Sequence, residues 1–136
     1  MACPFFFPEE RHEAELWAFR ARLPLGDGFR GRCMAPGCDG RAASDDELKN
    51  FCNVGYAQGC ACRPHEREAD AVHFAAVENG SIEVRFAFVK DQAPAGHGVL
   101  EFDAEARKWM STHPNATVQR MAECYVEAWL KRRGRA

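Results

Sequence analysis

The chain of 136 residues lacks several features that would assign it to a broad class at once. No apolar run approaches the roughly 18 residues that a membrane-spanning helix needs, so the sequence predicts no contact with a membrane. The formal net charge is only −2, which makes nucleic acid an unfavoured partner. No basic segment precedes the apolar residues 5–7, so no signal peptide is predicted and a cytoplasmic location is expected.

The sequence also lacks the short motifs of the common enzyme classes. It contains no nucleophile elbow, no phosphate-binding loop and no metalloprotease motif, and it shows no internal repeat. These absences favour a protein that is not an enzyme, although they leave thiol chemistry open.

Cysteine, in contrast, is abundant. Of the seven cysteines, five lie between Cys33 and Cys62, and Cys3 and Cys124 stand outside that segment. In a chain without an export signal, this density indicates a metal site or thiol chemistry rather than disulfides, because cytosolic thiols stay reduced. The odd number agrees, since seven thiols cannot all pair. Cys124 is expected to be a small buried apolar residue.

The length is typical of one domain covering residues 1–136. Its two halves differ in pattern. Residues 1–70 carry most of the cysteines and are expected to form the metal-binding half. Residues 71–136 alternate or repeat their apolar positions regularly, and they are expected to form a sheet and a C-terminal helix.

The N-terminal half contains few regular patterns. A proline, two glutamates and an apolar stripe at helical spacing predict a helix over residues 8–22. Residues 24–43 are rich in Gly, Pro and Arg and are predicted to be a loop that carries two of the clustered cysteines. Ser44 begins a capping box, so a short helix is predicted from there to Cys52. Residues 53–70 are predicted to return to loop.

The C-terminal half begins with a predicted β-hairpin around Asn79 and Gly80. A two-residue loop would place the apolar side chains of the two strands on opposite faces. A three-residue loop, residues 78–80, pairs Val77 with Ser81 and places them on one face, so this register is predicted. The shared apolar face then carries Val72, Phe74, Ala76, Ile82, Val84 and Phe86.

A third short strand is predicted over residues 98–103, and one or two helical turns over 104–110. The last helix is predicted to start at a cap on Asn115. Its core-facing positions are Val118, Met121, Ala122, Tyr125 and Trp129. The predicted fold class is α+β: a small antiparallel sheet, made of the hairpin and a third strand, with a C-terminal helix and a loop-rich, cysteine-bearing N-terminal half.

The spacing of the cysteines bears on the kind of metal. Structural zinc sites commonly use two close pairs with two to four residues between the cysteines of each. Only Cys33 and Cys38 approach that spacing, since Cys52 stands alone and Cys60 and Cys62 are closer than a usual pair. Iron–sulfur clusters are larger and accept ligands from scattered segments, so the irregular spacing favours iron. The compact ferredoxin run of cysteines is absent, and a ferredoxin fold is not predicted.

Three sequence phrases resemble a family of small, uncharacterised bacterial proteins. They are CPFF at residues 3–6, RLPLGDGFRGRC at 22–33 and FCNVGYAQGC at 51–60. In that family a leading Cys-Pro, a Cys after a PLG phrase and a CN-x-GYA-x-GC element recur, followed by a D-A-V-x-F strand, here residues 70–74. The resemblance implies an iron–sulfur protein with the ligand set Cys3, Cys33, Cys52 and Cys60.

Three functional hypotheses follow. The first is a protein that binds a 4Fe–4S cluster and serves electron transfer or redox sensing with an unidentified redox or regulatory protein partner. The second is a zinc-stabilised interaction module, and the third is a thiol redox switch that uses Cys60 and Cys62 with help from Arg63. Cys38 and Cys62 remain alternate ligands, because the Cys60-Ala61-Cys62 segment leaves the fourth ligand open.

Overall fold

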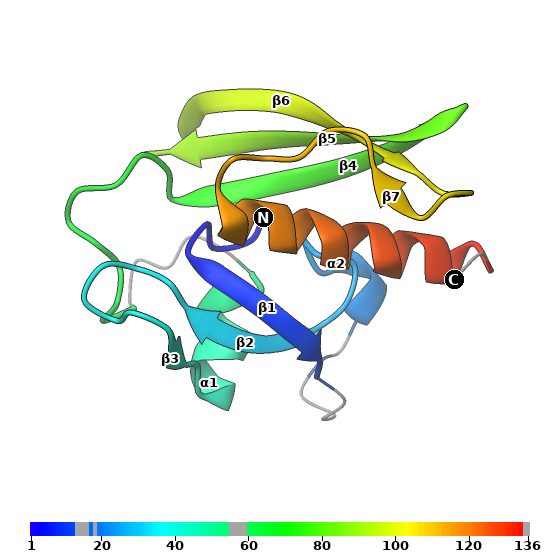
Figure 1. The fold of residues 1–136 in the computed structure, drawn as a ribbon. Helices are drawn as coiled ribbons and strands as arrows, with labels where there is room; N and C mark the ends of the chain where they lie inside the picture. Colours follow the sequence, from blue (N-terminus) through cyan, green and yellow to red (C-terminus); the bar gives the residue numbers. More distant parts are fainter. Residues whose placement is uncertain (13–16, 18, 55–59, 135–136) are drawn as a thin grey trace.

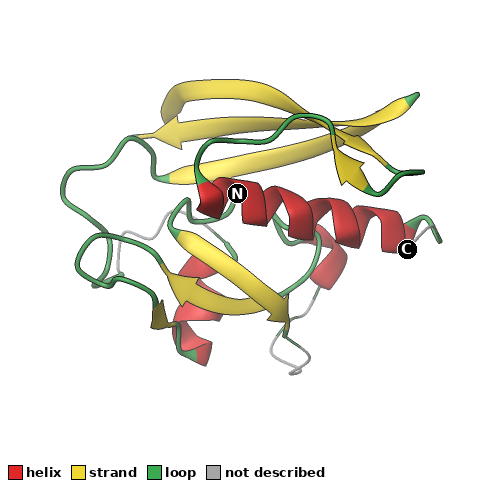
Figure 2. Cartoon of the chain, in the orientation of Figure 1, coloured by secondary structure: helices red, strands yellow, loops and turns green. Residues whose placement is uncertain are grey.

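The computed structural model describes residues 1–12, 17, 19–54 and 60–134, and its fold is α+β. The described residues form a three-stranded and a four-stranded antiparallel sheet, with the helix α2 (Ala116–Arg132) lying between them (Figures 1 and 2). The predicted fold class is confirmed. The N-terminal half nevertheless contains a sheet of its own where the sequence predicted mostly loop.

The first sheet consists of β1 (Phe6–Arg11), β2 (Phe29–Cys33) and β3 (Arg41–Ala42), in that order. The predicted helix over residues 8–22 is therefore wrong at its start. Phe6 and Pro8 are buried while the last three residues of β1 are exposed, and ion pairs link Glu9 to Arg32 and Glu10 to Arg30 across the strands. Proline is tolerated here because β1 is an edge strand and because the register shifts after Pro8.

The rest of the predicted first helix differs as well. Residues 13–16 and 18 lie outside the described residues. The apolar stripe of that predicted helix included Phe19, which is 69% exposed. Among the described residues of the segment 12–22, Arg20–Arg22 form a single 3₁₀ turn, η1. Residues 6–11 form a strand because pairing with β2 gives their backbone hydrogen-bond partners and buries part of their side chains. A short helix at the same place would be only marginally stable without such packing.

The short helix beginning at Ser44 is confirmed. Ser44 and Glu47 make the predicted capping box, α1 spans Asp45–Glu47, and the π-helical turn η2 (Leu48–Cys52) follows and ends at Cys52. Among the described residues of the predicted loop 53–70, none forms a helix or a strand.

The second sheet has the order β4 (Ala71–Asn79), β5 (Ser81–Lys90), β6 (Ala93–Asp103) and β7 (Lys108–Trp109). The hairpin register is two residues from the prediction, since Asn79 and not Val77 pairs with Ser81. A shift of two residues preserves the side-chain faces, so the predicted apolar face is correct. The third strand is longer than predicted, and β7 replaces the helical turns expected over 104–110.

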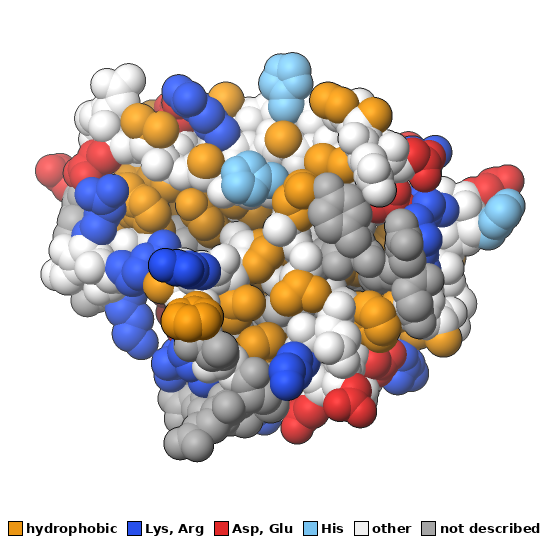
Figure 3. Space-filling view, turned by 180° about the vertical axis from the view of Figure 1, so that it is seen from behind, with side chains coloured by type: hydrophobic (Ala, Val, Ile, Leu, Met, Phe, Trp, Pro, Cys, Tyr) orange, Lys and Arg blue, Asp and Glu red, His pale blue; other side chains and the backbone are white. Residues whose placement is uncertain are grey.

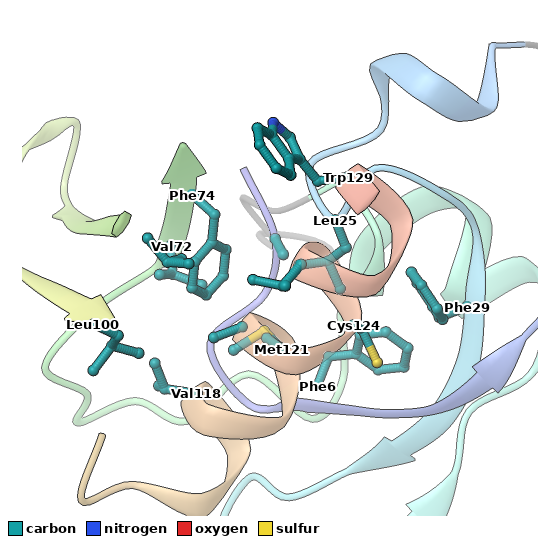
Figure 4. Close-up of a cluster of buried hydrophobic side chains, with 14 of the residues drawn as sticks. Phe6, Leu25, Phe29, Val72, Phe74, Leu100, Val118, Met121, Cys124 and Trp129 are labelled. Carbon is teal, nitrogen blue, oxygen red and sulfur yellow. The ribbon is translucent and has the colours of Figure 1, made fainter. Parts of the chain in front are cut away.

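The core lies on both sides of α2 (Figure 4). Asn115 caps the helix as predicted, accepting hydrogen bonds from the amides of Thr117 and Val118. Val118, Met121, Ala122 and Trp129 are buried, and Tyr125 is half-buried. On one side they meet the second sheet through Val72, Phe74 and Leu100, and on the other the first sheet and its loops through Phe6, Leu25 and Phe29.

Among the described residues, no helix has the length and apolar character that crossing a bilayer requires. On the face opposite to that of Figure 1, hydrophobic side chains spread across the middle, with basic side chains mainly at the left and acidic ones at several places around the edge (Figure 3). No single charge covers this face.

Candidate metal centre

The N-terminus is fixed to the second sheet, and this places Cys3. Ala2 is fully buried and exchanges two backbone hydrogen bonds of 2.8 Å with Val72. The amide of Cys3 donates to the carbonyl of Cys52 at 3.2 Å, and Phe6 is only 1% exposed. Burying one Phe side chain stabilises a fold by roughly 1.5–3 kcal/mol, enough to hold a chain terminus. Cys3 is thereby held beside Cys52.

Backbone amides donate hydrogen bonds to the sulfur atoms of Cys3 and Cys33. The amides of Phe5 and Phe6 hydrogen bond to the Cys3 sulfur, and the amide of Ala35 hydrogen bonds to the sulfur of Cys33 at the end of β2. Such N–H···S contacts favour thiolate over thiol, and in iron–sulfur proteins they tune the reduction potential. These amides lower the pKa of both thiols, although burial has the larger, opposite effect.

Cys52 is buried at the end of η2, and its position depends on Asn53. The Asn53 side chain is 1% exposed; its Oδ1 accepts from the amide of Phe29 at 3.0 Å, and its Nδ2 donates to the carbonyls of Phe29 (3.0 Å) and Leu48 (3.1 Å). These bonds join η2 to β2. Sequence reasoning missed this role, although the Asn directly after Cys in the FCNVGYAQGC phrase was its signal.

Cys60 completes the group from the opposite side. A small cavity lies between Cys3, Cys33 and Cys60, and Cys62, Phe5 and Ala35 also line it. Its volume of about 20 Å³ equals little more than one water-sized probe. One side of the cavity is formed by residues of the segment 60–69, which belongs to neither sheet.

Every pair among Cys3, Cys33, Cys52 and Cys60 is close enough for charge on one sulfur to affect the next. Burial and, more weakly, charge on Cys33 and Cys60 together raise the pKa of Cys3 to about 11, against the amides of Phe5 and Phe6. Burial, and then charge on the other three sulfurs, raises the pKa of Cys52. The pKa of Cys33 is also raised, by burial first and then by Cys60. The raised pKa values favour the neutral thiols of Cys3, Cys33 and Cys52, and a bound cation would reverse this preference, because metal ligands are thiolates.

The sulfur separations differ from those of a zinc site. With Zn–S bonds of about 2.3 Å, tetrahedral geometry puts the sulfurs about 3.8 Å apart. Among the described residues, no three of Cys3, Cys33, Cys52 and Cys60 have sulfurs within 4.8 Å of one another. The three sulfurs that do are those of Cys33, Cys38 and Cys62.

Cys38 and Cys62 form a disulfide in the structure. The sequence indicated free thiols rather than disulfides, and the structure differs from that expectation at this pair. The thiol switch of Cys60 and Cys62 stays a prediction. The alternate ligands Cys38 and Cys62 stay a prediction, and they would offer thiolates to a metal once this bond is reduced. Their pairing arises because the loop after β2 folds back against the segment after Cys60, a contact between residues 24 positions apart.

Basic side chains surround the cysteines. Arg41 donates from Nη2 to the sulfur of Cys62 at 3.2 Å, and its charge also acts on Cys33. Its ion pair with Glu47 lowers the pKa of Glu47 to about 2. The role of Arg41 was not foreseen beyond a general excess of arginine near the first cysteines.

Asp70 fastens the segment after Cys62 to the second sheet. Its carboxylate accepts hydrogen bonds from Arg63 (2.9 Å), from Arg67, and from the amide of Asp91 (2.7 Å). Burial disfavours its charge, but these hydrogen bonds outweigh that cost and lower the pKa of Asp70. Arg63 and Arg67 line the cysteine cavity together with Asp70, whose carboxylate offsets part of their positive charge there.

Cys124 lies away from this group, as the sequence predicted. It is buried on α2, on the side that faces Phe6 and Phe29 (Figure 4), and burial raises the pKa of its thiol to about 12. It behaves as a small apolar core residue.

No family model, no curated protein and no solved structure matches this chain. The resemblance to a bacterial family through the phrases around Cys3, Cys33, Cys52 and Cys60 therefore stays an expectation.

Proposed function

We propose that the protein binds a 4Fe–4S cluster through Cys3, Cys33, Cys52 and Cys60 and takes part in electron transfer or redox sensing. One observation carries the proposal: these four free cysteines come from four separate segments, and every pair of them interacts electrostatically. Cubane clusters take four thiolate ligands from such scattered positions.

The surroundings fit this group. The sulfurs of Cys3 and Cys33 accept backbone amides, and the guanidinium groups of Arg41, Arg63 and Arg67 offset the negative charge that four thiolates and a cluster would bring. Phe5 covers one wall of the cavity and limits access of water. When bound, a cluster of this type accepts and releases one electron, and amide contacts and burial set its potential.

The wide sulfur separation supports iron over zinc. A structural zinc ion would need four sulfurs closer together than those of the four free cysteines. Among the residues that the structure describes, the one group of three cysteine sulfurs within 4.8 Å of one another is Cys33, Cys38 and Cys62, and two of these form the disulfide. An electron-transfer or sensing role further implies a redox or regulatory protein partner, which we place, like this protein, in the cytoplasm.

Metal analysis after anaerobic reconstitution tests the proposal. The protein is expected to hold about four iron and four sulfide per chain, with broad visible absorbance that fades on reduction. Zinc at about one per chain without sulfide would contradict the proposal and support the zinc-stabilised module instead.

A further inference from the structure

We propose that the Cys38–Cys62 disulfide is redox-active and that the protein reduces a disulfide of a partner protein with electrons from the neighbouring cluster site. This inference rests on the proposed function, because the proposed cluster would supply the electrons that reduce the disulfide. It assigns an activity to the two cysteines that the cluster does not use.

The disulfide lies directly against the proposed ligands. The sulfurs of Cys38 and Cys62 are both within 4.8 Å of the sulfur of Cys33, and Cys62 lines the same cavity as Cys3 and Cys60. Cys62 is also only two residues from Cys60 along the chain. Cys33 is thus the proposed ligand whose sulfur lies next to the disulfide, and a cluster held by Cys33 would be positioned to supply its electrons.

The two sulfur atoms of the disulfide differ in burial and in their charged neighbours. Cys62 is buried and has the guanidinium of Arg41 at 3.2 Å, so positive charge faces the sulfur that becomes negative when the bond breaks. Cys38 is half-buried in an exposed turn. The structure thus distinguishes a sulfur that meets the partner, Cys38, from a sulfur that remains inside, Cys62.

The turn around Cys38 offers room for a polypeptide. A Cβ atom built on the neighbouring Gly37 would meet no atom within 4 Å, and Met34 is 45% exposed in the same turn. Exposed apolar surface beside an accessible sulfur suits a protein disulfide as the substrate. A reduced one-electron carrier protein is the class of donor that would supply the cluster site.

The reaction balances in two stages. Two electrons, delivered singly, and two protons break the Cys38–Cys62 bond and leave two thiols. The Cys38 thiolate then attacks the substrate disulfide, forms a mixed disulfide and releases the first substrate thiol. The Cys62 thiolate attacks the Cys38 sulfur, reforms the original disulfide and releases the second. The sum is one substrate disulfide, two electrons and two protons giving two substrate thiols.

The test uses the full chain, reconstituted anaerobically, with reduced methyl viologen as the one-electron donor and insulin as the substrate disulfide. We expect viologen to make Cys38 and Cys62 available to iodoacetamide, as mapped by peptide mass spectrometry. Wild-type protein should take up about two more electrons per chain than Cys38→Ser, which keeps its iron, because a disulfide is a two-electron couple. Insulin reduction should be lost in Cys38→Ser and Cys62→Ser and kept in Cys124→Ser, the matched control outside the site.

A second variant separates the disulfide from the cluster. Cys52→Ser removes a proposed ligand but leaves the disulfide, so dithiothreitol should still reduce it while viologen should not. If the protein contains iron and sulfide but reduced viologen does not reduce the Cys38–Cys62 disulfide, this inference alone is wrong and the disulfide has a structural role. Protein with both thiols free as isolated and no insulin reduction would overturn it too. Absence of iron from the wild type would instead refute the proposed function.

Discussion

Replacing Cys3 by Ser tests the least expected ligand. A cysteine at position 3 would ordinarily be a poor candidate, because chain ends fray. Here the end is anchored by the two 2.8 Å hydrogen bonds between Ala2 and Val72 and by the 3.2 Å bond from Cys3 to the carbonyl of Cys52. All three bonds use backbone atoms, so the substitution leaves them in place.

The expected magnitudes follow from these contacts. Serine has nearly the shape of cysteine and accepts the same amides of Phe5 and Phe6, so the free energy of unfolding of the apo-protein should change by less than about 1 kcal/mol. The hydroxyl is a far poorer ligand for iron. We therefore expect Cys3→Ser to lose most of the roughly four iron per chain, as severely as Cys52→Ser.

Iron, sulfide and visible absorbance after identical anaerobic reconstitution measure the first effect, and urea unfolding of the apo-proteins measures the second. Cys124→Ser serves as the control, since its sulfur is buried elsewhere in the core, and Cys38→Ser should also keep its iron. If Cys3→Ser holds full iron with unchanged absorbance, Cys3 is not a ligand and the fourth sulfur must come from Cys38 or Cys62.

Four further outcomes are expected. Phe6→Ala should lower the free energy of unfolding by about 3–5 kcal/mol in urea titrations, whereas Phe19→Ala, at a 69% exposed site, should leave it nearly unchanged; equal losses would contradict the packing. Asn53→Ala leaves the amide and carbonyl of Phe29 without their partner, so it should cost about 1–3 kcal/mol and reduce iron loading, with Asn50→Ala on an exposed position as its control. The apo-protein should lose stability in alkali. Because the folded state raises the pKa of Cys3 from 9.0 to about 11, the contribution of Cys3 to the free energy of unfolding is constant below pH 9 and falls from there to about pH 11; a flat series of urea midpoints between pH 9 and pH 11 would refute this. Finally, cluster removal should raise amide exchange in residues 60–69 while β2 stays protected by its pairing with β1, and equal changes in both segments would show that the site supports the whole N-terminal half.

Local sequence patterns were sufficient for the elements whose partners are close in the chain. The capping box at Ser44, the cap at Asn115 and the apolar spacing along α2 each depend on residues within one or two helical turns, so the sequence contained the whole signal. The hairpin faces were likewise determined, because alternation has a period of two and survives a register shift of two residues. Cysteine spacing indicated a scattered thiolate group in the same way.

Contacts between distant segments decided the rest. Residues 6–11 carry a helix-like beginning, yet pairing with β2, some 20 residues later, makes them a strand and brings Cys3 to Cys52. The Cys38–Cys62 bond depends on how two irregular segments meet, and no local pattern encodes that meeting. The sequence by itself determined which residues can carry the chemistry. Only the tertiary structure decided which sulfurs face one another, because their positions depend on backbone hydrogen bonds and burial shared between segments that local propensity does not connect.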